Sequence, residues 1–514
     1  MNIQFEFVAV ETLPPLAWCA RLKRGDRTAT VFHGRSVETT PGFFAEAAWN
    51  DDFTAAGLLA ATVLCGTGGA CGARGFVFRA STDGQSPLFS VRKGNVVHVS
   101  NSPVFALAAA GERPDPLHPF YSHDLLRIFR RGVHGSRETL RTASPEAVLG
   151  VHFFVTVGID RDLAMQFEGP PAGVEPVDWS HYERLLEEAV RVVVANASAP
   201  GRRLTYRPVA RVSRGYDSTA SAALAASAGC REAVTLRDSR AEDPDRDNGA
   251  WIAAALGMTC RSIDRWEYLL RDDGADAENG LAIESATPAW TALQDDLAGR
   301  LVVVGTHGDC TWTMDRRSTP SFDLERPRTR GIGGFGSLEF RLRTGFLQLA
   351  PPTIGWRHGA RIVAIGRSAE LRSWSIGGPY DRPLPRRIAE DRGVPRKLFG
   401  MVKMAGGHAH LYRDRDFSPA GLRDYDAFRV RSQASASCLA RTGARVTCAL
   451  EEAAWLCLHG GRRRSAIAMR LPWQPVVLTG ERARIPWRFR FVFQWACDTL
   501  SHRYRLPEPK SAAG

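Results

Sequence analysis

The sequence is almost without lysine, because only five of its 67 basic residues are lysine and the other 62 are arginine. A net charge of +12 would by itself favour an anionic partner such as a nucleic acid. The arginines, however, are scattered among acidic residues, and a coding bias toward arginine and alanine explains their excess most simply. The composition therefore argues against nucleic-acid binding, although an anionic polymer held by the denser arginine clusters stays open as an alternative.

Long apolar runs and paired cysteines are also missing. No stretch approaches the ~20 uninterrupted apolar residues of a transmembrane helix. The first residues include Glu6 and Glu11 and lack the basic and apolar segments of a secretory signal. The ten cysteines form no Cys-x-x-Cys pair and no Cys/His cluster with zinc spacing. From these absences we expect a cytoplasmic protein, outside the membrane, with reduced cysteines and no structural metal.

The first third of the chain has the pattern of β-structure. A length of 514 residues predicts two or three domains. Short apolar runs separated by turn residues predict strands at Gly75–Phe78, Leu88–Val91, Val96–Ser100 and His152–Val157. The Asp83-Gly84 pair between two of these runs predicts a tight hairpin turn. A Pro/Gly-rich linker at Gly169–Pro176 then precedes an amphipathic helix over Tyr182–Ala195.

After residue 205 the pattern changes to alternating strands and helices. Strands are expected at Pro208–Val212, Glu232–Leu236, Thr259–Ile263 and Leu301–Val304, and helices at Thr219–Ala228 and Arg246–Leu256. This alternation predicts a parallel sheet with right-handed crossovers, on which ligands bind beyond the carboxyl ends of the strands. From Leu338 the chain reads as mostly helical, with a terminal helix at Pro486–Arg503 that begins at its proline.

The segment Ser213-Arg214-Gly215-Tyr216-Asp217-Ser218 lies between an expected strand and an Ala-rich helix. A helix N-terminus offers unpaired N–H groups and partial positive charge, and a glycine allows the backbone to approach a phosphate. The hydroxyls of Ser213, Ser218 and Thr219 can donate to phosphate oxygens, and Asp217 suits Mg²⁺ better than a bare pyrophosphate. The alternative is an ordinary N-capped helix after a turn.

This segment resembles the Ser-Gly-Gly-x-Asp-Ser phosphate motif of the asparagine synthetase superfamily. Two further stretches resemble that family in order and spacing: Gly305-Thr306-His307-Gly308-Asp309, and the run from Arg382 through Pro395-Arg396-Lys397 to Lys403. The resemblance implies a glutaminase-like (Ntn-type) α+β sandwich over 1–170. It also implies an α/β ATP-pyrophosphatase domain with a parallel sheet, of the adenine nucleotide α-hydrolase type, over 180–410, and a helical extension over 411–514.

The N-terminal stretches Pro87–Leu107 and Leu149–Ile159 look like strands of the family's glutaminase domain. That domain uses a cysteine directly after the initiator methionine as its nucleophile, whereas the second residue here is Asn2 and the first cysteine is Cys19. An amide cannot replace a thiolate as the attacking group. The resemblance therefore implies a degenerate glutaminase. The nitrogen would come from ammonia or a substrate amine, as in the β-lactam synthetases and lasso-peptide cyclases of the superfamily.

The resemblance implies ATP and Mg²⁺ as cofactors and assigns roles to particular residues. The nucleotide is expected to contact Ser213, Arg214, Gly215, Tyr216, Asp217, Ser218, Thr219, Leu236, Asp247, Gly305, His307 and Gly308. Asp217 and Asp309 are the expected metal ligands, against the alternative of turn or capping residues. Lys403 is expected to stabilise the adenylating transition state or help deprotonate the amine, with Lys397 as a competitor. Glu284 is the candidate substrate-side carboxylate, although a solvated loop glutamate is the simpler reading.

Two departures from the family pattern bear on activity. Arg214 stands where the family has its second glycine, and Cys310 stands where relatives carry an acid. The resemblance thus implies an AMP- and pyrophosphate-forming ligase that joins a small-molecule or peptide carboxylate to ammonia or an amine. A nucleotide-binding scaffold that has lost catalysis is the alternative. Specificity is expected to lie in the Arg/Gly/Pro-rich segment Asp315–Gly336, read as a mobile lid.

Overall fold

The structure is a computed structural model of the chain. It describes residues 3–73, 75–271, 275–282, 287–329, 331–378, 380–401, 411–434, 439, 442–443, 445–446 and 486–507. Both predicted catalytic residues, Glu284 and Lys403, lie outside these described residues. Within the described part, no helix combines the length and the apolar character needed to cross a bilayer.

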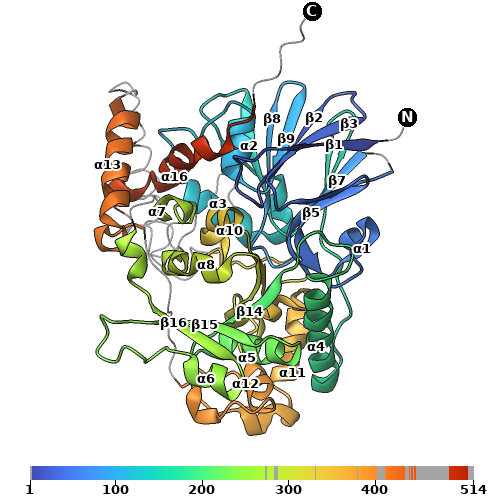
Figure 1. Cartoon of the computed structure of the whole chain (residues 1–514), viewed down its shortest axis with the longest axis vertical. Helices are drawn as coiled ribbons and strands as arrows, with labels where there is room; N and C mark the ends of the chain where they lie inside the picture. The colour runs from blue at the N-terminus through green and yellow to red at the C-terminus, as the bar shows by residue number, and fades with distance from the viewer. Residues whose placement is uncertain are drawn as a thin grey trace, which may run out of the picture.

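The N-terminal part is a sandwich of two sheets (Figure 1). The first sheet has the order β1-β3-β2-β9-β8-β11-β10, and its only parallel pair is β1 with β3. Its strands are β1 (Gln4–Ala9), β2 (Trp18–Lys23), β3 (Thr28–His33), β8 (Leu88–Lys93), β9 (Val96–Ser100), β10 (Thr139–Arg141) and β11 (Ala147–His152). The second sheet is antiparallel, with the order β13-β12-β7-β6-β5-β4. It contains β4 (Glu38–Thr40), β5 (Phe43–Trp49), β6 (Leu64–Cys71), β7 (Gly75–Arg79), β12 (Thr156–Asp160) and β13 (Met165–Glu168).

Aromatic side chains fill the space between these two sheets. Trp18 of β2 contacts Phe44 of β5 edge-to-face at 4.8 Å between ring centroids and stacks on Phe78 of β7. All three are fully buried. Offset and edge-to-face aromatic pairs stabilise beyond the area that they bury, by about 0.5–1.5 kcal/mol each. The short helices α1 (Ala55–Ala60), α2 (Pro103–Ala109) and α3 (Tyr121–Arg130) complete this part, with the 3₁₀-helix η1 (Gly132–Arg137).

Two predictions for the sandwich are wrong in a related way. Asp83-Gly84 does not close a hairpin, because β7 and β8 belong to different sheets and the turn carries the chain from one sheet to the other. The expected strand His152–Val157 is divided, since β11 ends at His152 and β12 begins at Thr156. Phe153, Phe154 and Val155 cross between the sheets while remaining buried. A continuous apolar run therefore marked a buried crossing rather than one strand.

The second part contains a five-stranded parallel sheet of order β16-β15-β14-β17-β18. The predicted α/β class with a parallel sheet is thus confirmed, and four of its strands lie where expected. They are β14 (Arg207–Arg211), β15 (Glu232–Arg237), β16 (Thr259–Asp264) and β17 (Arg300–Val303). The fifth, β18 (Leu347–Leu349), was not predicted, because three residues inside a region of helical character carry too little pattern.

Helices cover both faces of the parallel sheet, so that successive strand residues pack into different cores. Ala210 and Val303 pack with α4 (Trp179–Asn196), α5 (Tyr216–Ser227), α11 (Gly359–Gly366) and α12 (Pro383–Glu390). Val209 and Val302 pack on the other side with η3 (Pro288–Leu293), α8 (Gln294–Leu297) and α10 (Leu338–Thr344). The sequence between the two parts, 169–177, has no regular structure, as expected of a linker.

Helix α6 (Ala250–Ala255) is shorter than the predicted helix Arg246–Leu256. The residues before it form turns, in which the Asp243 carboxylate accepts the Asp245 backbone N–H and Asn248 donates to Asp245. Such side-chain bonds compete with helix formation, and they account for the later start. The predicted terminal helix Pro486–Arg503 is likewise divided into η11 (Trp487–Phe489), α16 (Val492–Leu500) and η12 (Ser501–Tyr504), so Pro486 does not begin the α-helix.

The C-terminal segment returns to the N-terminal sandwich (Figure 1). Helix α16 packs on α7 (Ala275–Glu278), on α13 (Pro419–Ala434) and on α2. Phe493 stacks on Tyr121 of α3 at 4.8 Å, and Tyr504 stacks on Phe105 of α2 at 5.0 Å. One apolar core therefore contains residues from both ends of the chain.

Candidate functional site

The predicted phosphate loop lies between β14 and α5, at the carboxyl end of the central strand. Gly215 is the N-cap of α5, in extended conformation, and Asp217 lies in the first turn. The hydroxyl oxygens of Ser213 and Ser218 are 2.8 Å apart, and Thr219 donates to the backbone carbonyls of Ser213 and Gly215. These hydroxyls therefore fix the shape of the loop from within.

The second Gly-rich loop, which follows β17, packs directly on the start of α5. A Cβ at Gly305 would lie 2.5 Å from the backbone carbonyl carbon of Asp217, and one at Gly308 would lie 2.5 Å from Oδ1 of the same residue. Real Cβ atoms do not approach other atoms so closely, so both positions require glycine in this arrangement. The structure thus brings together the two loops that the sequence singled out separately.

Asp217 forms an ion pair with Arg382, the residue immediately before α12. Nη1 of Arg382 lies 2.8 Å from Oδ1 and 2.6 Å from Oδ2 of Asp217. Burial lowers the pKa of Arg382, but the Asp217 carboxylate outweighs burial, with help from Asp309, and the net pKa is raised. Asp309 itself is exposed, at the start of α9 (Gly308–Thr311). Both predicted metal ligands therefore act on one guanidinium.

The donor set at this place fits a magnesium ion in part. The described residues contain no group of three or more His, Cys, Asp or Glu side chains arranged to hold a metal. Mg²⁺ in nucleotide sites, however, commonly takes one or two carboxylates and completes its shell with phosphate oxygens and water. Asp217 already holds a positive charge, and Asp309 lies close enough to act on the same cation. These two carboxylates are the residues that would hold the ion.

Arg214 and Tyr216 point away from the position expected for a phosphate. Arg214 donates through Nε to the carbonyl of Leu398 at 3.0 Å, and its own carbonyl accepts the N–H of Gly400. Tyr216 is fully buried, accepts a hydrogen bond from Arg386 at 2.6 Å, and packs against Phe399. Both side chains join the phosphate loop to the segment after α12.

His307 is buried in the second loop rather than directed at the mouth of the site. Its φ of +69° is left-handed, and Nδ1 lies 2.9 Å from Nη1 of Arg326, which donates to it. The ring packs against Trp356 at 5.4 Å and Phe129 at 6.0 Å between centroids. Burial, with the charge of Arg326, keeps the pKa of His307 well below its ordinary value, so the imidazole is neutral and structural.

The remaining predicted residues lie around the loop at different depths. Asp247 precedes α6, and its carbonyl accepts the N–H of Arg214 at 3.4 Å, beside the bridge between Ser213 and Asn248. Leu236 lies at the end of β15 and is 8% exposed. Cys310 is buried and donates from Sγ to the His307 carbonyl, and burial raises the pKa of its thiol to about 12. Cys310 therefore supports the loop rather than supplying a carboxylate.

The segment Asp315–Gly336, read from the sequence as a mobile lid, packs against the sandwich. Leu324 and Phe335 are buried, and the carbonyl of Asp323 accepts the N–H of Val133 in η1. Arg130 of α3 donates through Nε to the carbonyl of Thr329 at 2.8 Å. The described part of this segment is thus a connection between the two halves of the protein.

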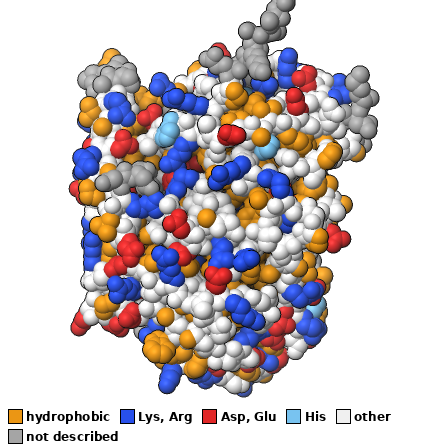
Figure 2. Space-filling view, in the orientation of Figure 1, with side chains coloured by type: hydrophobic (Ala, Val, Ile, Leu, Met, Phe, Trp, Pro, Cys, Tyr) orange, Lys and Arg blue, Asp and Glu red, His pale blue; other side chains and the backbone are white. Residues whose placement is uncertain are grey.

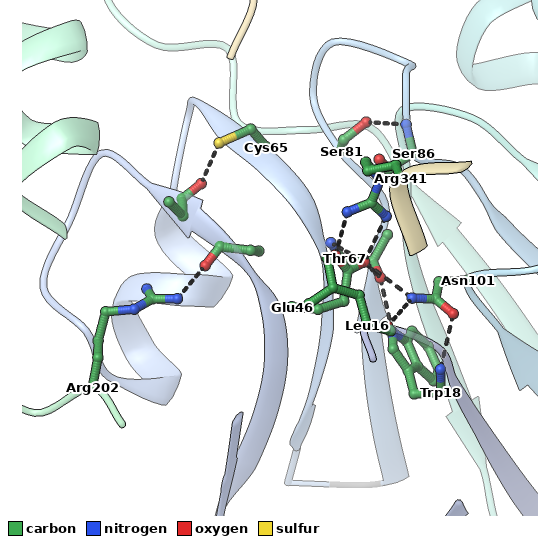
Figure 3. Close-up of polar contacts among 12 residues, drawn as sticks. Leu16, Trp18, Glu46, Cys65, Thr67, Ser81, Ser86, Asn101, Arg202 and Arg341 are labelled. Carbon is green, nitrogen blue, oxygen red and sulfur yellow. Dashed lines mark hydrogen bonds and ion pairs between the residues drawn. The ribbon is translucent and has the colours of Figure 1, made fainter. Parts of the chain in front are cut away.

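A buried polar network lies where the sandwich meets α10 (Figure 3). Arg341 of α10 donates to both carboxylate oxygens of Glu46, at 2.6 and 3.1 Å. Glu46 also accepts from Thr67 at 2.6 Å and from Asn101 at 3.2 Å. Glu46 and Arg341 are each only 1% exposed. This buried ion pair joins the two halves of the protein, and sequence reasoning did not find it.

The buried cysteines Cys19 and Cys65 of the sandwich are poor nucleophiles. Cys19 is completely buried, and burial raises its pKa far above the ordinary value. Burial likewise raises the pKa of Cys65, to about 12, and its Sγ donates to the carbonyl of Ala48. A thiol with a raised pKa is protonated near neutral pH and is a poor nucleophile. Neither thiol is therefore suited to nucleophilic catalysis near neutral pH.

The sequence was also compared with known proteins. No protein-family model matches the chain, and no curated protein matches it. What the site does must therefore be argued from its own residues.

Proposed function

We propose that this chain is an ATP-dependent ligase of the asparagine synthetase type, built from a degenerate glutaminase-like sandwich and an ATP-pyrophosphatase-like domain. It would convert ATP to AMP and pyrophosphate while joining a carboxylate to ammonia or an amine. It would not hydrolyse glutamine, because Asn2 stands where that kind of glutaminase carries its cysteine nucleophile, and burial keeps the thiols of Cys19 and Cys65 protonated.

One observation carries the proposal, namely the close packing of the two Gly-rich loops at the carboxyl ends of β14 and β17. Gly305 and Gly308 lie against Asp217 and the backbone of Ser218, at the N-terminus of α5. Helix N-termini at such a sheet edge bind anions. An ordinary capped helix would not require a second loop with two obligatory glycines at its first turn.

The proposed chemistry assigns a task to each group. A substrate carboxylate oxygen attacks the α-phosphorus of ATP, the bond to the bridging oxygen breaks, and pyrophosphate leaves. The α5 N-terminus and Arg382 would hold the departing charge, and preorganised positive groups of this kind lower the barrier. Magnesium bound at Asp217 and Asp309 would neutralise the phosphate oxygens. The amine then attacks the acyl carbon, loses a proton, and releases AMP.

The test is carboxylate-dependent exchange of labelled pyrophosphate into ATP, with extract fractions or peptides as the acid pool. Asp217→Asn should reduce exchange by about 10²-fold or more, because the magnesium ion that would neutralise the departing pyrophosphate loses a carboxylate ligand. Asp162→Asn, in an exposed turn of the sandwich, is the matched control and should leave exchange unchanged. Wild-type protein that binds ATP and shows no exchange with any acid would refute the ligase proposal.

A second candidate, a non-catalytic nucleotide-binding scaffold, is favoured by the pairing of Asp217 with Arg382. An acid neutralised by a permanent guanidinium is less available to a metal. Under this alternative ATP would bind with little dependence on Mg²⁺, and Asp217→Asn would leave its affinity nearly unchanged. Basic and acidic side chains are interspersed on the face shown in Figure 2, so this face does not support the binding of an anionic polymer.

A further inference from the structure

Arg382 is held by three contacts at the first turn of α5. Its Nη1 contacts both oxygens of Asp217 at 2.6 and 2.8 Å, and its guanidinium lies 5.5 Å from the centroid of the Tyr380 ring. Its backbone is fixed as the N-cap of α12, where Pro383 is the first helical residue. The side chains of Arg382 and Asp217 are only 11% and 16% exposed. The pair is therefore a built feature of the site.

We propose that Arg382 is the resident cation of the phosphate site, which occupies Asp217 until nucleotide arrives and then binds the phosphate oxygens. This inference rests on the proposed function and names one of its binding residues. It assigns Arg382 two partners in turn, the carboxylate before binding and the phosphates afterwards. It also makes a divalent cation and the guanidinium competitors for Asp217.

The charges support an exchange of partners. An arginine side chain stays protonated near neutral pH whichever anion it contacts. One nitrogen of Arg382 contacts both oxygens of Asp217, so its positive charge opposes a metal ion at the same carboxylate until that nitrogen moves. A guanidinium that leaves a carboxylate needs another anion, and phosphates are its preferred bidentate partners. A triphosphate at the α5 N-terminus supplies one.

Neighbouring arginines have other tasks. Arg386 donates to the Tyr216 hydroxyl and to Glu390, and Arg214 donates to the Leu398 carbonyl. Arg387 pairs with Glu370 and Asp391. Each of these supports the packing of α12 or of the segment after it. Arg382 differs from them in pairing with an acid of the phosphate loop.

The deciding experiment measures two affinities in Arg382→Met, which keeps much of the side-chain length and removes the charge. Affinity for Mn²⁺ alone, followed by electron paramagnetic resonance, should rise about tenfold because Asp217 becomes available. Affinity for ATP in the presence of EDTA, followed by calorimetry, should fall about tenfold because the phosphates lose a cation. Arg382→Lys should lie between the wild type and Arg382→Met in both. Arg387→Met, one turn along α12, is the control for loss of one positive charge and should change neither affinity.

A purely structural cross-link gives a different result. If Arg382 only holds α12 to the loop, its removal loosens the site and weakens both Mn²⁺ and ATP, and this outcome would overturn the proposal. Unchanged Mn²⁺ affinity in a variant with a wild-type thermal transition would also overturn it. Wild-type protein that binds neither ATP nor pyrophosphate would refute the proposed function instead. The Mn²⁺ comparison would then still decide whether Arg382 competes with a cation at Asp217.

Discussion

His152 of β11 is a buried imidazole with both nitrogens engaged. Its Nδ1 donates to the Ser136 carbonyl at 3.0 Å, and its Nε2 accepts from the Ser90 hydroxyl at 2.8 Å. Because burial disfavours the charged form, the pKa of His152 falls from 6.5 to about 4. The folded state thus requires the neutral ring, while the unfolded chain protonates near pH 6.5.

This residue makes stability depend on pH in a defined window. The contribution is complete above pH 6.5 and is lost as the pH falls through about 4. Between pH 7 and pH 4.5 the wild type should lose about 2.5 kcal/mol more unfolding free energy than His152→Gln, which cannot titrate. Urea unfolding at the two pH values measures this difference. Equal losses in the two proteins would show that another group is responsible.

At the level of single residues, the sequence pattern singled out Asp217 but not the arginine that contacts it. Asp217 was recognisable because a glycine, a strand and an Ala-rich helix surround it along the chain. Arg382 was not, because it pairs with Asp217 across 165 positions and is one of 62 arginines. His307 shows the same limit, since its burial depends on Phe129 and Trp356, which the chain brings in from elsewhere. The roles of Lys403 and Glu284 stay predictions.

Among the elements, the contact between the second loop and α5 gives the clearest test of the site. Gly308→Ala should place a methyl group against the Asp217 carboxylate, and overpacking of this kind costs about 1–3 kcal/mol. We expect a lower thermal transition and ATP affinity reduced at least tenfold, because the loop and Asp217 move apart. Differential scanning fluorimetry and calorimetry measure the two effects.

Gly158→Ala in β12 is the control for the glycine substitution, because the nearest atom to its added Cβ would be 3.9 Å away. That variant should keep both properties. If Gly308→Ala bound ATP with wild-type affinity, the second loop would have no part in the nucleotide site.

Element prediction succeeded where the pattern was local. Apolar segments bounded by turns predicted four of the five parallel strands, and an amphipathic period predicted α4. It was wrong where tertiary structure decides, as at Asp83-Gly84, which joins two sheets instead of two paired strands. Gly84 has a φ of +74° and lies against the Phe154 ring, so the turn required glycine although the hairpin did not exist. Turn chemistry predicts a change of direction but not the partner strand.

For the molecule as a whole, the ion pair between Glu46 and Arg341 fastens the sandwich to α10. Arg341→Met leaves the Glu46 charge buried and uncompensated, and such changes cost about 3–5 kcal/mol. The double variant Glu46→Gln/Arg341→Met should regain part of this loss, because it removes the stranded charge. Urea unfolding of both variants measures the difference. Arg361→Met, which removes only hydrogen bonds to Pro176 and Val177, is the control.

The Arg341 prediction would be contradicted in either of two ways. Arg341→Met could unfold at the wild-type urea concentration, or the double variant could be less stable than Arg341→Met. Either result would mean that the two halves are held together mainly by their apolar contacts.

The packing of α16 on α2 and α3 has a consequence for synthesis. The apolar side chains around Phe105 and Tyr121 find their covering partners, Tyr504 and Phe493, only after nearly 400 further residues have been translated. At about 5–20 residues per second, a ribosome needs roughly 20–80 s to supply them. During that interval the apolar surface around Phe105 and Tyr121 stays exposed on the nascent chain. Until α16 is made, this apolar surface leaves the nascent chain open to aggregation.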